Sequence, residues 1–193
     1  ADTPFTHNVY SAPTSLGGLD VNLTINVDPS VRVGADLTAG GSDYLHAQGG
    51  GTLHFTYPPY GEMSMTGHYE MSGGGELSYT LPVVGNKLFT IDPTSTLSWT
   101  GPITNPYLNF TAVNKVKASV ANSSGNAQRV NFNVSILIKD YVSKMNLGFG
   151  LSAPENLSVQ NSISTMPREE QGKQALALMG TGMCLAGGGG GSS

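Results

Sequence analysis

The clearest signal of fold class in this chain is the segment Lys87–Val120, which reads KLFTIDPTSTLSWTGPITNPYLNFTAVNKVKASV. Two short alternating stretches, Phe89–Ile91 and Leu97–Trp99, flank a turn at residues 92–93. A second turn, at residues 101–106, leads into a longer stretch of alternating apolar and polar residues. Period-two alternation punctuated by Pro and Gly predicts β-strands joined as a meander.

The same alternation runs through most of the chain. In Glu62–Ser72, for example, Met63, Met65 and Tyr69 share one face and polar residues occupy the other. Three consecutive glycines at residues 49–51 fall inside an extended stretch, which indicates a bulge, a bend or a close backbone approach. The expected strands are Leu19–Val27, Val31–Leu37, Tyr44–Tyr57, Glu62–Ser72, Leu77–Val83, Phe89–Ile91, Leu97–Trp99, Leu108–Val120, Val130–Ile138, Met145–Leu151 and a short Leu157–Val159.

The period changes near the C-terminus, where residues 167–186 predict one helix. Thr165 is the expected N-cap, Pro167 suits the first turn, and Glu169 can pair with Lys173 four residues later. The expected organisation is a lead-in at 1–18, a β-domain at 19–166, the helix at 167–186 and a Gly/Ser tail at 187–193. The fold class is all-β with one C-terminal helix and ten to twelve mostly antiparallel strands. One-sided strands fit a sandwich, a barrel or a folded-over sheet with an apolar interior.

Composition excludes several classes of function. Charged residues are 11% of the chain and the net charge is -4, without a Lys/Arg cluster, which argues against nucleic-acid binding. The four histidines lack metal-ligand spacing, and no catalytic acid, base or nucleophile set can be assembled. We therefore expect no enzyme activity, no metal and no cofactor. The single cysteine, Cys184, permits no internal disulfide.

Methionines on the apolar faces leave two interpretations open. Met63, Met65, Met71 and Met145 fit an ordinary core, in which flexible thioethers fill gaps. The same residues fit the adaptable wall of a long apolar groove for acyl chains or extended hydrophobic polypeptide. The sequence alone does not choose between them.

Several of these segments resemble the C-terminal domain of the TamB family. The opening segment is similar to the family pattern "F-T-I, turn, S-x-x-x-W-x-G-x-x-x-x-P-x-L-x-x-x-A", which here spans Phe89–Ala112. Thr52–Val84 resembles the hairpin of that family and Leu19–Val33 its opening strand pair. The most specific resemblance is the strand–helix ending, Leu151–Met183.

This resemblance implies a periplasmic, non-enzymatic domain with a sheet folded over an apolar channel. It implies that the chain is a fragment of a protein held in the inner membrane by an N-terminal helix absent here. The implied partner is the outer-membrane barrel TamA, or a related assembly barrel. The implied cargo is phospholipid or unfolded outer-membrane protein, and the implied roles are outer-membrane biogenesis, protein secretion or lipid transport.

We expect twelve large apolar residues to face such a groove. They are Met63, Met65, Tyr69, Leu77, Tyr79, Phe89, Trp99, Leu108, Phe110, Phe132, Ile136 and Phe149. One alternative is a secreted β-sandwich adhesin or glycan-binding module, which would need exposed aromatics and an Asp-rich loop. Another is a transmembrane barrel, which would carry aromatic girdles at both strand ends; the aromatics here are scattered along the strands.

Overall fold

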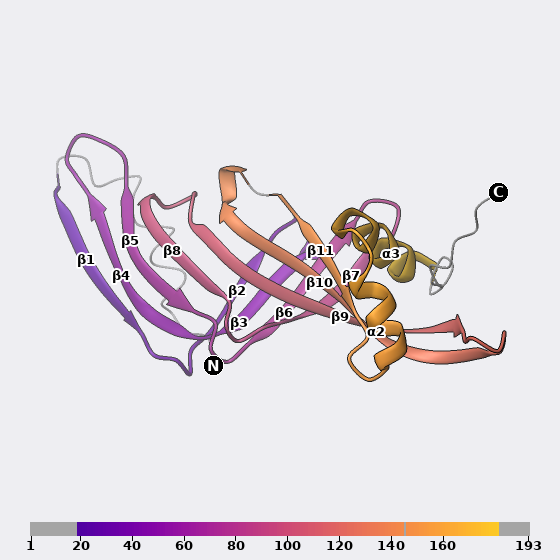
Figure 1. Ribbon diagram of the computed structural model, residues 1–193. Helices are drawn as coiled ribbons and strands as arrows, with labels where there is room; N and C mark the ends of the chain where they lie inside the picture. The colour runs from indigo at the N-terminus through magenta and orange to yellow at the C-terminus, as the bar shows by residue number, and fades with distance from the viewer. Residues whose placement is uncertain (1–18, 145, 182–193) are drawn as a thin grey trace.

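A computed structural model describes residues 19–144 and 146–181 of the 193-residue chain. In these residues eleven strands are followed by two helices, and Figure 1 shows how they are arranged. The strands are β1 (Val21–Val27), β2 (Arg32–Asp36), β3 (Tyr44–Gln48), β4 (Gly50–Tyr57), β5 (Ser64–Glu70), β6 (Gly75–Leu81), β7 (Gly85–Ile91), β8 (Thr96–Pro102), β9 (Tyr107–Ala121), β10 (Ala127–Tyr141) and β11 (Gly148–Ser152). The helices are α2 (Leu157–Ser164) and α3 (Arg168–Thr181), and a 3-10 turn, η2 (Val142–Lys144), follows β10. Neither α2 nor α3 has the length and apolarity needed to cross a membrane.

All eleven strands belong to one antiparallel sheet that forks at β9. Along one edge, the start of β9 pairs with β8 (Leu97 with Leu108), and a later part pairs with β7 (Ile91 with Ala112). The first arm continues from β8 through β5 and β4 to β1, and the second from β7 through β6 and β3 to β2. The other edge of β9 pairs along its whole length with β10, which also carries β11. Within residues 19–144 and 146–181, the strands β1, β2 and β11 each have one partner, so the sheet formed by these residues is open.

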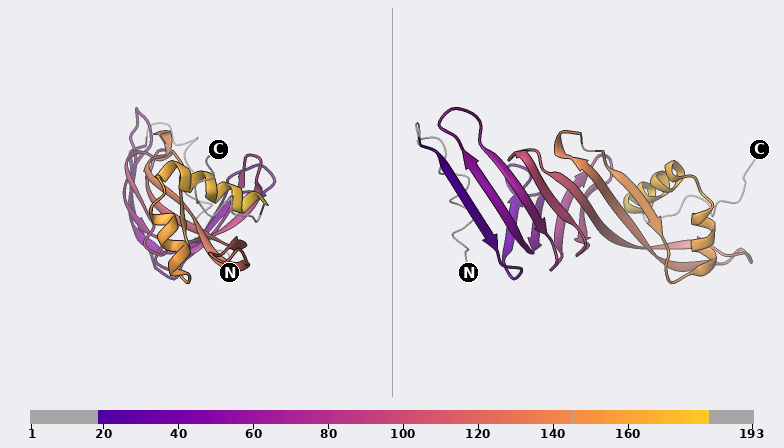
Figure 2. Two further views of the ribbon diagram at one scale, coloured as in Figure 1. Left: turned by 45° about the vertical axis from the view of Figure 1, so that its right-hand side comes forward. Right: turned by 60° about the vertical axis from the view of Figure 1, so that its left-hand side comes forward.

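The chain passes between the two arms four times, always at the same end of the strands. These passages, at residues 28–31, 49, 71–74 and 92–95, form what we call the fold line. Backbone hydrogen bonds continue across it, with the Gly49 N–H donating to Val31 O (3.1 Å) and the Met71 N–H donating to Ser95 O (2.9 Å). The sheet is therefore folded over on itself rather than divided into two, and the two arms face each other (Figure 2).

Glycine is required where the strands bend at the fold line. A Cβ at Gly49 would overlap the carbonyl oxygen of Glu70, and one at Gly51 would overlap the carbonyl oxygen of His68. These contacts are to backbone, which cannot rotate away, so larger residues would push β4 from β5. The glycine run at residues 49–51 therefore allows the close backbone approach expected from the sequence.

The hydrophobic core is concentrated at the β9–β11 end of the fold. Phe132 and Ile136 of β10 are each 1% exposed and belong to the same buried cluster as Leu178 of α3. Helix α3 packs on β11, and a Cβ added at Gly180 would lie 3.7 Å from Val84, in the turn between β6 and β7. The helix thus reaches from β11 to the second arm and covers this end of the space between the arms (Figures 1 and 2).

The predicted fold class is confirmed: an open, folded-over, mostly antiparallel sheet is followed by helical structure. The hairpin around residues 122–126 is also confirmed, because Ala121 pairs with Ala127. The ion pair between Glu169 and Lys173 is present, with 3.6 Å between the carboxylate oxygen and Nζ. The predicted lead-in at 1–18, helix end at 182–186, tail at 187–193, Met145 and Cys184 lie outside the described residues.

Four local predictions are wrong. Strands β7 and β8 do not form a meander, and residues 73–75 do not close a hairpin, because in both cases the chain crosses the fold line into the other arm. The expected short strand at 157–159 is helix α2, since the Asn156 side chain caps it by accepting from the Val159 N–H at 3.0 Å. Thr165 ends α2 instead of beginning α3, and its hydroxyl donates to Ser162 O at 2.8 Å.

Candidate binding surface between the two arms

The inner surface of the first arm is built from cross-strand rows of apolar side chains. Partners in an antiparallel ladder face the same way, so the register places residues from β1, β4, β5 and β8 side by side. The row nearest the fold line is Val27, Gly51, Tyr69, Leu97 and Leu108. The next is Ile25, Leu53, Gly67 and Trp99, and the third is Leu23, Phe55, Met65 and Gly101.

The second arm presents a matching inner surface. Its row nearest the fold line is Val33, Ala47, Gly75, Ile91 and Ala112, and the next is Ala35, Leu45, Leu77 and Phe89. The two sets of rows meet on β9, where the first arm ends at Leu108 and the second at Ala112. The alternation of the sequence is thus converted into two facing apolar walls.

Burial is uneven along these walls, and even on the edge strand β1 Ile25 is buried. Ala112 on β9 is fully buried and Phe89 on β7 is 1% exposed, whereas Leu23 on the edge strand β1 is 48% exposed. Leu97, Trp99 and Leu108 are only partly buried where they pack on the core. The first arm therefore offers apolar area that the protein's own core does not fully cover.

The twelve residues predicted to face a groove fall into two groups in the structure. Seven are buried: Met65, Tyr69, Leu77, Phe89, Phe110, Phe132 and Ile136. Five are partly buried: Met63, Tyr79, Trp99, Leu108 and Phe149. The predicted residues on the two arms and on β9 lie together along the inner surface. Phe132, Ile136 and Phe149 lie instead at the end covered by the helices. A role in binding cargo stays a prediction for all twelve.

Some inner-surface residues are missing from the predicted set. Leu23, Leu53 and Phe55 share rows with Trp99 or Met65. The alternation within β1 and β4 marks them as one-sided, so this signal was available in the sequence. What the sequence does not supply is the strand order that places β1 and β4 beside β5.

The polar groups of the inner surface are satisfied with one exception. The Trp99 indole N–H donates to Ile103 O at 2.9 Å. Asn114, the lone polar residue on the apolar face of β9, donates through Nδ2 to Leu88 O at 2.8 Å. This bond holds β7 to β9 just beyond their last backbone pair, Thr90 with Val113. Among the described residues, the Tyr69 hydroxyl is the one buried side-chain polar atom without a hydrogen-bond partner.

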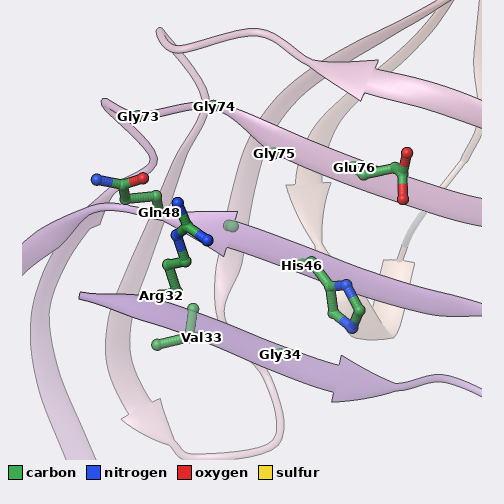
Figure 3. Close-up of a pocket in the computed structure, with 10 residues that line it drawn as sticks. Arg32, Val33, Gly34, His46, Gln48, Gly73, Gly74, Gly75 and Glu76 are labelled. Atoms are coloured by element: carbon green, nitrogen blue, oxygen red, sulfur yellow. The ribbon is translucent and has the colours of Figure 1, made fainter. Parts of the chain in front are cut away.

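A separate pocket of about 580 Å³ lies on β2, β3 and β6 near the fold line. Figure 3 shows the residues that line it. Arg32, His46, Gln48 and Glu76 line it together with Val33, Gly34, Ala47 and Gly73–Gly75. The His46 ring stacks on Tyr44, with ring centroids 4.4 Å apart. Its lining mixes charged and polar side chains with apolar ones, unlike the rows of apolar side chains between the arms, so we do not include this pocket in the candidate binding surface.

The outer side of the second arm holds a buried carboxylate. Asp43 is 6% exposed, and its oxygens accept from the Thr80 hydroxyl (2.6 Å), the Thr80 N–H (3.1 Å) and Asn86 Nδ2 (3.2 Å). The hydroxyl hydrogen bond from Thr80 is the main cause that lowers the pKa of Asp43. These bonds attach the loop after β2 to β6 and β7. In the described part of the chain, no group of three or more His, Cys, Asp or Glu side chains is arranged to hold a metal ion.

Comparison with known proteins gives one match. The family model described as the TamB C-terminal domain matches residues 7–193. No curated protein and no solved structure matches the chain.

Proposed function

Because this chain belongs to the TamB C-terminal domain family, we propose that it binds apolar cargo between its two arms as a non-enzymatic module of the bacterial envelope. The cargo is phospholipid acyl chains or strands of unfolded outer-membrane protein. The site of action is the periplasm, in outer-membrane biogenesis, protein secretion or lipid transport. The partner is an outer-membrane assembly barrel, TamA or a relative.

The observation that carries this proposal is the incomplete burial of the first arm's inner surface. Leu97, Trp99 and Leu108 are partly covered, and Leu23 is 48% exposed. Covering apolar area contributes about 25 cal/mol per Å², or about 0.8 kcal/mol per methylene. An acyl chain with about ten methylenes between the walls would gain about 8 kcal/mol before the cost of ordering it is subtracted.

The lining residues favour cargo of variable shape. Met65 of β5 is buried in the row that also holds Phe55 and Gly101. Methionine adapts to neighbours of different shape through its three rotatable bonds, which suits a wall that meets many lipid species or strand sequences. Each row of the first arm also contains one glycine, at 51, 67 or 101, and Gly101 has open space where a Cβ would lie.

Native mass spectrometry of protein purified without detergent, followed by organic extraction, tests the proposal. We expect adducts with phospholipid masses that extraction removes. Protection of the inner surface by an amphipathic strand peptide, with no lipid adduct, would support assembly of outer-membrane protein instead. A lipid-free protein that binds neither probe would overturn the proposal.

A further inference from the structure

The Tyr69 hydroxyl is a buried hydrogen-bond donor that has no partner among the residues the structure describes. Tyr69 is 5% exposed, and its hydroxyl is closed off from solvent. Leaving such a group unsatisfied costs more than a typical hydrogen bond contributes. Phenylalanine would fill the same volume without this cost, so the hydroxyl has no evident value for folding.

Tyr69 lies on the inner surface of the first arm, against which the proposed cargo would pack. It lies in the first-arm row nearest the fold line, between Gly51 of β4 and Leu97 of β8. It also belongs to the core cluster that contains Ala47 and Leu77 of the second arm. The hydroxyl is therefore enclosed in the apolar region where the two walls approach each other.

Resting on the proposed function, we propose that Tyr69 is a specificity-determining residue whose hydroxyl donates a hydrogen bond to an ester carbonyl of an acyl lipid held between the arms. A saturated hydrocarbon chain alone would leave the donor unsatisfied. An ester-linked lipid brings carbonyl acceptors on an otherwise apolar chain, which matches one phenol donor in an apolar wall.

A lipid ester matches this site better than a polypeptide strand does. A strand would bring a backbone N–H and C=O at every residue, and each would need a partner on burial. The indole N–H of Trp99 and the amide of Asn114 are already bonded within the protein. A single unsatisfied donor therefore suits a ligand that has few polar atoms, all of which are hydrogen-bond acceptors.

The phenol remains a donor under ordinary conditions, because burial raises the pKa of Tyr69. Reaching it requires the side chains around it to part, and the buried cluster that contains Tyr69 also holds Met71, a residue type with three rotatable bonds.

The test compares diacyl phosphatidylcholine with its dialkyl ether analogue, which lacks both carbonyls. Competition between the two lipids for the full chain is measured by native mass spectrometry. We expect the wild-type protein to prefer the ester lipid by about 3- to 10-fold, the value of one hydrogen bond. Tyr69→Phe should abolish the preference and should unfold at a urea concentration at least as high as wild type. Tyr107→Phe, which removes a hydroxyl from an exposed tyrosine on β9, should retain the preference.

Each other outcome has a defined meaning. Equal binding of ester and ether lipid by wild type, or a preference that survives in Tyr69→Phe, would overturn this inference and leave the proposed function standing. Binding of neither lipid, together with binding of a strand peptide that is weakened by Tyr69→Phe, would show that the hydroxyl serves a peptide carbonyl and would overturn the lipid assignment. Binding of no lipid and no peptide would overturn the proposed function itself.

Discussion

Gly67, in the middle of β5, offers a sharp test of how the first arm is built. It pairs with Leu53 of β4 and Trp99 of β8 and has a φ of 131°. An alanine Cβ there would overlap the Thr52 carbonyl oxygen and lie 2.9 Å from Leu53 Cα. Ordinary van der Waals contacts begin at 3.4 Å, so Leu53 Cα alone would have to move by 0.5 Å.

The cost of Gly67→Ala combines two effects. Holding a non-glycine residue at this φ costs about 1–3 kcal/mol, and forcing an extra methyl into backbone costs about 1–3 kcal/mol. Their sum is a loss of about 2–6 kcal/mol in the free energy of unfolding. With a urea dependence of about 2 kcal/mol per molar, the unfolding midpoint should fall by about 1–3 M.

Urea unfolding followed by circular dichroism measures this loss, and Gly101→Ala is the matched control. Gly101 also faces inward in the first arm and is not among the glycines with positive φ, and no atom of the described residues lies within 4 Å of an added Cβ. Its substitution should change stability by less than about 1 kcal/mol. Equal midpoints for the two variants would refute the close packing of β4 against β5 on which the arm depends.

Three further results are expected. Asp43 has a folded-state pKa below its ordinary value of 3.8, so its bonds stabilise the protein above that pH, and this stabilisation is lost as the pH falls through the folded-state pKa. Asp43→Asn should therefore have a lower urea unfolding midpoint than wild type at pH 7, and the gap between the two midpoints should narrow as the pH is lowered. A gap that stays the same down to pH 2 would contradict this. Asn156→Ala removes the cap of α2 and should cost about 1 kcal/mol by thermal unfolding, while Asn161→Ala on the exposed side of α2 should not. Trp99 should shift its fluorescence to shorter wavelength when acyl-chain lipid is added; an unchanged spectrum at saturating lipid would indicate that it lies away from the cargo.

Strands could be located from the sequence because their determinants are local. The alternation from Val21 to Val27 requires only that one face be buried, and Pro82 marks the end of β6 because proline cannot continue the ladder. Alternation alone left a sandwich, a barrel and a folded-over sheet open, and it was the family resemblance that predicted the folded-over sheet. Strand pairing depends on distant partners, so the same glycine run at 73–75 fits a hairpin or a passage across the fold line.

The C-terminal error has a similar cause. Leu157 and Val159 alternate over only three residues, which fits a strand as well as a helix, and the Asn156 cap decides the outcome. The candidate site was predictable to the level of inward-facing residues such as Met65 and Phe89. The unsatisfied hydroxyl of Tyr69 was not predictable, because it depends on which atoms of other strands lie near it.

Site-specific photo-crosslinking tests the binding of apolar cargo between the arms most directly. A benzoylphenylalanine at Leu53 would face the inner surface, and one at the neighbouring Thr52 would face outward, where the Thr52 hydroxyl now donates to Asn26 Oδ1. We predict that irradiation with phospholipid vesicles, or with a strand peptide, gives cargo adducts at position 53 and few or none at position 52. Adducts of equal yield at both positions, or only at position 52, would contradict the account.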